Sequence, residues 1–195
     1  PDDRIVKVQA AAKAIRGASE VKARQFLQLL GLLNSCIFQI QWGRLFTRPL
    51  QVYLQAWWKP SQGHIDDLIP IRPNLRRHLL WWENEENLRR GVSLHYWEPD
   101  VVLASDASME GWGAYLEQGG EVNGKWPEDQ SLKHINWLEM KAIFNALLHF
   151  ESRVTGTKIR VKCDNTTVVA YLNKQGGTHS TSLCYLAWDL LNWCR

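Results

Sequence analysis

At the centre of the 195-residue chain stands the run Val101-Val102-Leu103-Ala104-Ser105-Asp106, four apolar residues followed by a serine and a carboxylate. A short apolar run of this kind is typical of a buried strand. Beyond it, Trp112, Ala114 and Leu116 recur at every second position, which predicts a second strand. Gln118-Gly119-Gly120 provides a turn, and residues 121–126 predict a third strand. The three strands together predict an antiparallel meander.

A long helix and a fourth strand are predicted after this meander. Leu138, Ile143 and Leu147 lie on one side of a helix drawn over residues 136–150. Residues 158–164 predict the fourth strand, which ends in Asp164. Two further helices are predicted over residues 166–173 and 183–193. This half of the chain is therefore expected to be an α/β domain with a mixed sheet and flanking helices.

The half of the chain that precedes Val101 has a helical pattern. Phe26, Leu29 and Leu33 recur at helical spacing. Thr47, with Pro49 two residues later, predicts the start of a second helix, residues 59–70 predict a loop, and a third helix is predicted from residue 73 to near residue 91. The boundary between the halves is expected near residues 98–100. We therefore predict a helical region over residues 1–97 and an α/β domain over residues 98–195.

The composition is that of a folded, non-membrane chain. Hydrophobic residues make up 45% and charged residues 22%, enough apolar material for a core. No apolar run approaches the roughly 20 residues of a membrane-spanning helix, and the first residues lack the pattern of a secretory signal. Four scattered cysteines argue against a disulfide framework or a zinc ribbon and favour a reducing, intracellular location in the cytoplasm or nucleus: Cys36, Cys163, Cys184 and Cys194.

The charge is unevenly distributed. Residues 1–97 hold 14 Lys and Arg against 8 Asp and Glu, whereas residues 98–195 hold 9 against 12. A basic half suits a polyanion whose phosphates bind Lys and Arg, and Arg76 and Arg77 are the candidate contacts. Solvated helix faces are the alternative explanation of the same charges.

Three carboxylates stand at related positions of the predicted elements. Asp106 ends the first strand, Glu139 lies in the first turn of the long helix, and Asp164 ends the fourth strand. If the first and fourth strands are neighbours, the two aspartates lie side by side and Glu139 can reach them. Such a cluster repels itself unless a divalent cation neutralises it, and oxygen ligands favour Mg²⁺ or Mn²⁺. Taken singly, each could instead be a turn residue, a helix cap or a helix-dipole partner.

The order strand-Asp, two strands, helix-Glu, strand-Asp resembles the ribonuclease H domain of DIRS-type, tyrosine-recombinase retrotransposons. The resemblance lies in Ala104-Ser105-Asp106-Ala107-Ser108, in Asn136-Trp137-Leu138-Glu139-Met140 and in Lys162-Cys163-Asp164-Asn165-Thr166. Upstream, residues 24–34 resemble the thumb helix of a retroelement reverse transcriptase, and residues 43–51 and 80–82 resemble its connecting region. The resemblance covers nearly the whole chain.

This resemblance implies a ribonuclease H fold that hydrolyses the RNA strand of RNA–DNA hybrids with two Mg²⁺ or Mn²⁺ ions. Asp106 would bridge both ions, and Glu139 and Asp164 would complete the cage. The substrate-binding positions implied for RNA 2′-hydroxyl groups are Ser108, Asn136 and Asn165. The expected partners are an RNA–DNA hybrid and an upstream polymerase palm of the same polyprotein.

The resemblance also implies a fourth acid, which we expect beyond Arg195, so that the domain is expected to be cut before its last strand. Asp189 is predicted to lie on a helix outside the site, and the pair Asp66-Asp67 in a solvated loop. The alternative function is a catalytically inactive nucleic-acid-binding or scaffold module on the same fold.

Overall fold

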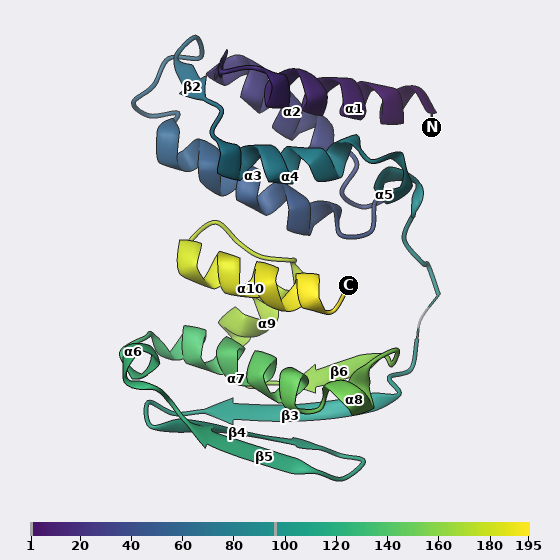
Figure 1. Ribbon diagram of the computed structural model, residues 1–195, viewed down its shortest axis with the longest axis vertical. Helices are drawn as coiled ribbons and strands as arrows, with labels where there is room; N and C mark the ends of the chain where they lie inside the picture. Colours follow the sequence, from purple (N-terminus) through teal and green to yellow (C-terminus); the bar gives the residue numbers. More distant parts are fainter. Residues whose placement is uncertain (1, 96) are drawn as a thin grey trace. The chain divides into compact units, whose positions relative to one another are not determined.

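The computed structural model describes residues 2–95 and 97–195 (Figure 1). The chain divides into two compact units, Pro1–Ser93 and Leu94–Arg195. The boundary falls a few residues before the position where the composition changes.

The first unit is mainly helical. Its described helices are α1 (Asp2–Gly17), α2 (Ala23–Asn34), α3 (Gly43–Trp57), α4 (Pro73–Glu83) and α5 (Glu85–Arg89). Two short strands, β1 (Glu20–Lys22) and β2 (Leu68–Pro70), pair antiparallel with Val21 opposite Ile69. The predicted stripe of α2 is buried: Phe26 and Leu33 are inaccessible to solvent and Leu29 is nearly so. Helix α1 packs along α4, and the pair Arg16–Glu83 joins the two helices.

Two helix boundaries in this unit differ from the prediction. Helix α3 begins at Gly43, so Thr47 is not its cap: the Thr47 hydroxyl lies inside the helix and donates to the Gly43 carbonyl at 2.7 Å. Pro49 is consequently an interior proline. The predicted helix over residues 73–91 is divided at Asn84, whose side chain accepts from the Glu86 amide and caps α5. A capping side chain offers the backbone an alternative to a continuous helix.

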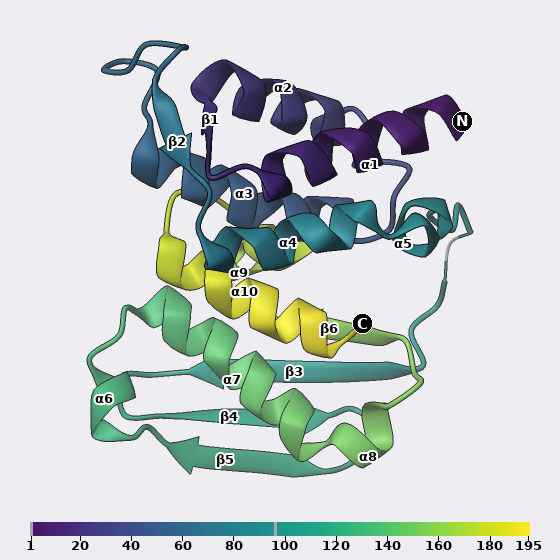
Figure 2. The same ribbon diagram turned by 45° about the horizontal axis from the view of Figure 1, so that its top comes forward.

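The second unit contains one mixed sheet in the order β5-β4-β3-β6 within its described residues (Figure 2). The strands are β3 (Val101–Ala107), β4 (Gly111–Leu116), β5 (Glu121–Lys125) and β6 (Ile159–Lys162). The first three pair antiparallel and β6 runs parallel to β3. The helices are α6 (Glu128–Ser131), α7 (Ile135–His149), α8 (Glu151–Val154), α9 (Thr166–Asn173) and α10 (Thr181–Trp193). The α/β class and the strand arrangement predicted from the sequence are confirmed.

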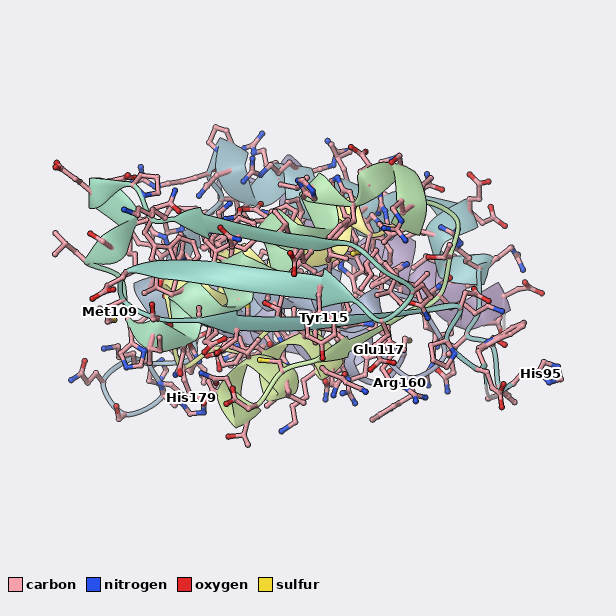
Figure 3. The ribbon with its side chains drawn as sticks, turned by 90° about the horizontal axis from the view of Figure 1, so that it is seen from below. His95, Met109, Tyr115, Glu117, Arg160 and His179 are labelled. Carbon is pink, nitrogen blue, oxygen red and sulfur yellow. The ribbon has the colours of Figure 1, made fainter. Side chains whose placement is uncertain are left out.

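Helix α7 covers one face of this sheet, against β3 and β4 (Figures 1 and 2). Leu103 from the sheet and Leu138 from the helix are fully buried between them. Helices α9 and α10 pack on α7 from its other side. Figure 3 views the sheet from the side away from α7, where Tyr115 and Glu117 lie exposed. A shallow hollow of about 710 Å³ is lined by residues of β3, β4 and β5 and of the turn between β3 and β4.

Within residues 2–95 and 97–195, every helix falls short of the length and apolarity needed to cross a membrane. All four cysteines lie in this described part of the chain and none forms a disulfide.

Candidate metal centre

The register of the sheet brings the two strand-end aspartates together. Strand β6 pairs with β3 so that Lys162 lies opposite Ala104. Two residues further along the chain, Asp106 still lies within β3, whereas Asp164 follows the end of β6, which stops at Lys162 and not at the predicted Asp164. The parallel pairing directs both residues toward the same edge of the sheet. Both side chains are exposed. The parallel pairing of β3 and β6, which the sequence predicted for the first and fourth strands, therefore brings the two aspartates near each other.

Glu139 reaches the same place from α7. The helix begins at Ile135, so Glu139 lies in its second turn rather than in the predicted first turn. Its side chain is only 5% exposed, which excludes a role as a solvated partner of the helix dipole. A small hydrophobic core of Trp126, Leu138 and Ala142 packs the start of α7 against Ala107 of β3 and Trp112 of β4. This packing positions the first turns of the helix on the sheet.

The carboxylates act on one another electrostatically. Burial raises the pKa of Glu139 to about 7, and the charges of Asp106 and Asp164 push it in the same direction. A hydrogen bond from the Ala107 backbone N–H works against this rise. A buried acid facing two like charges holds its proton until about neutral pH. Strongly perturbed acids of this kind gather at functional sites, although structural clusters also produce them.

One oxygen of the cluster lacks a partner. Glu139 Oε2 is buried and accepts no hydrogen bond from the described residues. An unsatisfied buried carboxylate oxygen is costly unless a cation or a donor compensates it. Hard carboxylate donors suit Mg²⁺ and Mn²⁺. The carboxylates of Glu139 and Asp164 therefore fit a divalent cation; Asp106 acts on Glu139 electrostatically, but its carboxylate is outside the group of ligand atoms that lie within 4.8 Å of one another.

A cysteine missed by the sequence reasoning belongs to the same cluster. The ligand atoms of Glu139, Cys163 and Asp164 all lie within 4.8 Å of one another. Burial raises the pKa of the Cys163 thiol, and the neighbouring carboxylates add to the rise. The sequence does place Cys163 directly before Asp164. A lone cysteine outside any Cys-x-x-Cys pattern, however, gives no reason to expect a metal ligand.

The predicted polar positions Asn136 and Asn165 lie together. Asn165 Nδ2 donates to Asn136 Oδ1 at 2.8 Å, which ties the start of α9 to the start of α7. Asn165 Oδ1 also accepts from the amides of Thr167 and Val168 and caps α9. Ser108 lies in the β3–β4 turn, where its hydroxyl accepts from the Gly111 amide. These contacts hold the loops around the carboxylates in place.

The two candidate arginines lie on α4 in the other unit and differ in their surroundings. Arg76 is half-buried, and its guanidinium donates to the carbonyls of Ala18 and Ile71 at 3.1 and 3.4 Å. Arg77 is exposed, and its Nε donates to His78 at 3.4 Å. Arg76 is thus engaged in holding its own unit together, whereas Arg77 faces solvent.

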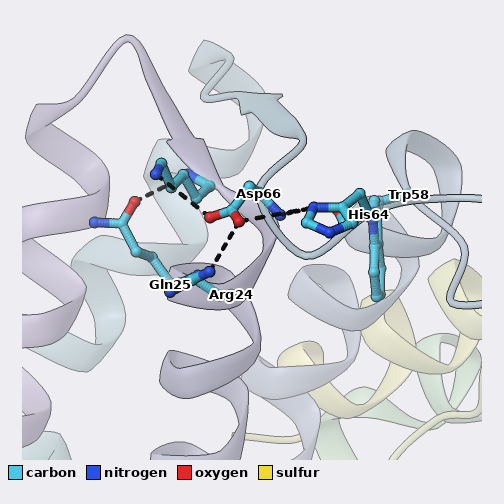
Figure 4. Close-up of polar contacts among 6 residues, drawn as sticks. Arg24, Gln25, Trp58, His64 and Asp66 are labelled. Atoms are coloured by element: carbon cyan, nitrogen blue, oxygen red, sulfur yellow. Dashed lines mark hydrogen bonds and ion pairs between the residues drawn. The ribbon is translucent and has the colours of Figure 1, made fainter.

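In the acidic pair of the 59–67 loop, Asp66 is neutralised by basic side chains (Figure 4). Asp66 forms ion pairs with Lys22 at 3.3 Å and Arg24 at 2.9 Å. Burial alone would raise the pKa of Asp66, but these cations lower it. The side chain of Asp67 accepts from the His64 amide at 2.7 Å. Asp66 and Asp67 therefore hold the loop in its conformation, and their carboxylates are engaged in these contacts instead of being available to bind a metal ion.

Asp189 lies exposed on α10, as expected for a helix surface position. It is not among the acids that raise the pKa of Glu139.

Comparison with known proteins gives structural similarities only. No known protein-family model matches the chain. No curated protein sequence matches it either. Among solved structures, the chain is similar to a foamy viral protease-reverse transcriptase in complex with RNA/DNA hybrid, with 14% identity and a TM-score of 0.33 over 93% of this chain and 25% of that chain. The same viral protein in complex with dsDNA gives 15% identity and a TM-score of 0.36 over 94% of this chain and 38% of that chain.

The chain thus spans well under half the length of these neighbours. The class of the second unit follows from its own geometry. A meander of three antiparallel strands, a helix across the sheet and a fourth strand parallel to the first make it a ribonuclease H-like α/β fold, preceded by a mainly helical region.

Proposed function

We propose that this chain is the ribonuclease H part, with a portion of the thumb and connection region, of a DIRS-type retrotransposon reverse transcriptase. The reaction is endonucleolytic hydrolysis of the RNA strand in an RNA–DNA hybrid. One observation carries the proposal: Asp106 and Asp164 both act electrostatically on Glu139, whose buried carboxylate oxygen Oε2 has no partner among the described residues.

Asp106, Glu139 and Asp164 are the residues that would hold two Mg²⁺ or Mn²⁺ ions. Such ions, when bound, supply charge that activates the attacking water and stabilises the leaving 3′ oxygen. Asp106 is exposed beside the hollow on the sheet, so a phosphodiester can approach its carboxylate. Glu139 is held rigidly by burial, which fixes its carboxylate without further reorganisation.

The polar side chains around the cluster would orient the substrate. The linked amides of Asn136 and Asn165, with Ser108 across the turn, offer donors and acceptors of the kind that distinguish an RNA 2′-hydroxyl from DNA. Their own hydrogen bonds restrict their rotamers, so they lose little side-chain entropy when they bind. They are positioning groups in this proposal.

The basic first unit would bind the phosphates of the hybrid. Arg77 is exposed on α4 and is the better candidate for phosphate contact, while Arg76 supports the unit from within. In the same proposal the first unit follows the polymerase palm of one polyprotein, and the location is intracellular. The free cysteines are compatible with a reducing compartment.

A cleavage assay tests the proposal. The chain, extended past Arg195 so that it includes the fourth acid that the resemblance implies, is incubated with a labelled RNA–DNA hybrid and Mn²⁺ or Mg²⁺, beside the variants Asp106→Asn and Asp189→Asn of the same extended chain. We expect RNA products with 3′-hydroxyl ends from the unaltered chain and from Asp189→Asn, and none from Asp106→Asn, which still binds the hybrid.

Two results would oppose the proposal. Hybrid binding without cleavage at any Mn²⁺ concentration would favour the inactive nucleic-acid-binding or scaffold module. Loss of cleavage in Asp189→Asn but not in Asp106→Asn would place the site elsewhere.

A further inference from the structure

Cys163 gives the acidic cluster a ligand of different chemistry. Its sulfur and the carboxylate oxygens of Glu139 and Asp164 lie within 4.8 Å of one another. Hard cations such as Mg²⁺ bind oxygen and have little affinity for a thiolate, whereas Zn²⁺ and Co²⁺ accept both. A thiol at this place is therefore unexpected for a site that serves hard cations alone.

The cysteine does not stand alone as a candidate ligand. Glu139 is 95% buried, from an exposure of 5%, and its Oε2 finds no hydrogen-bond partner in the described part of the chain. A buried, unpartnered carboxylate next to a thiol is an independent sign that a positively charged ligand belongs between them.

The spacing suits tetrahedral coordination after a small adjustment. With bonds of about 2.3 Å to sulfur and about 2.0–2.2 Å to oxygen, tetrahedral ligand atoms lie about 3.5 Å apart. The present limit of 4.8 Å closes to this value by side-chain movements of about 1 Å. Asp164 is exposed and free to make most of that movement.

The surroundings supply an outer support for the sulfur. The Asn165 backbone N–H donates to the Cys163 sulfur, as outer hydrogen bonds do for ligands in metal sites. Cys163 also lines a hollow of about 250 Å³ between β6, α7, α9 and α10. Cys194 lines the same hollow but does not belong to the ligand group.

We propose that Cys163, Glu139 and Asp164 form a binding site for one thiophilic divalent cation of the zinc type, with one coordination position left open. On binding, the thiol proton passes to solvent and the sulfur binds as thiolate. The site shares two carboxylates with the proposed Mg²⁺ cage. Zinc and the catalytic ions therefore exclude each other, an antagonism that rests on the proposed function.

The test uses Co²⁺ as a spectroscopic substitute for Zn²⁺ and needs no nuclease activity. The chain is titrated with Co²⁺ and the sulfur-to-cobalt charge-transfer absorption is recorded, followed by competition with Zn²⁺. The band should form in the unaltered chain and in Cys194→Ser, and Zn²⁺ should abolish it. Cys163→Ser should lose the band and bind Zn²⁺ at least tenfold more weakly, with an unchanged circular dichroism spectrum.

The proposal is wrong if the unaltered chain gives no charge-transfer band, or if Cys194→Ser loses it as completely as Cys163→Ser. If the charge-transfer band forms in a chain that does not cleave hybrids, the thiophilic cation site stands and the proposed nuclease function fails. Only the expected competition between Zn²⁺ and the catalytic ions would then be lost. Where cleavage is present, Cys163→Ser should resist inhibition by Zn²⁺ while the unaltered chain is inhibited.

Discussion

Among the three acids of the cluster, Glu139 is the one whose pKa is clearly raised. It is buried on the sheet-facing side of α7 and feels the charges of Asp106 and Asp164, and its pKa rises to about 7 as a result. From the sequence, the pairing of the strands that carry Asp106 and lead to Asp164 can be predicted, because the order of the elements is that of a mixed sheet with parallel first and fourth strands. The burial of Glu139 cannot, because it depends on how Trp126 and Leu138 seat the helix on the sheet.

The raised pKa of Glu139 predicts a stability that falls as pH rises. In the unfolded chain this carboxyl loses its proton near pH 4.5, whereas the folded chain keeps it to about pH 7. Between these values the unfolded state binds fewer protons, so unfolding becomes easier as pH increases. At about 1.4 kcal/mol per pKa unit, the loss is on the order of 1–3 kcal/mol.

Urea unfolding of Glu139→Gln measures this effect. The variant should match the unaltered chain near pH 4 and exceed its stability at pH 8. Mn²⁺ at pH 8 should reverse that order, because only the carboxylate gains from the cation. Equal pH dependence in the two chains would mean that Glu139 titrates normally.

At the scale of the elements, helix α9 begins two residues after Asp164 and is linked to the start of α7. Its predicted bounds, residues 166–173, are those of the structure, because Asn165 is a strong cap directly before an apolar run. The cap side chain also donates to Asn136 at the start of α7. One residue therefore terminates the loop after β6 and links the two helices beside the carboxylates.

Asn165→Ala should destabilise the second unit by about 1 kcal/mol, the usual cost of a lost helix cap. Asn165→Ser keeps an uncharged capping oxygen but removes the amide donor to Asn136, so it should recover most of the capping energy. Chemical denaturation of the three chains gives the comparison. A loss in Asn165→Ser as large as in Asn165→Ala would show that the link to Asn136, not the cap, carries the energy.

Some other elements could not be predicted from the sequence, for physical reasons. Strands β1 and β2 have three residues each, too short for any periodicity, and exist because Val21 and Ile69 meet across distant parts of the chain. The start of α3 was misplaced because a threonine followed by a proline is typical of a helix start, whereas here the Thr47 hydroxyl bonds back within the helix. Local patterns cannot distinguish these two uses of a hydroxyl.

On the scale of the whole molecule, the charge is divided between the units. The basic residues 1–97 and the mildly acidic residues 98–195 fit a chain in which one unit binds phosphates and the other performs chemistry. The structure refines the sequence-based choice of arginines, since Arg76 bonds to backbone carbonyls and Arg77 is exposed.

Arg77→Glu should weaken binding of an RNA–DNA hybrid and reduce the slope of log affinity against log salt by about one. Lys13→Glu is the matched control, since it makes the same charge change on an exposed face of α1. Binding titrations at several salt concentrations measure the slopes. Identical slopes in both variants would mean that net charge, not a contact at Arg77, governs binding.

The sheet edge at Asp106 and Asp164, together with Glu139, is in our proposal a divalent cation site. Crystals of the chain soaked in Mn²⁺ and measured at the manganese absorption edge test this proposal. We expect anomalous density between Asp106 and Asp164, next to Glu139. Density at Asp66 and Asp67 instead, or no density at the three carboxylates under saturating Mn²⁺, would contradict it.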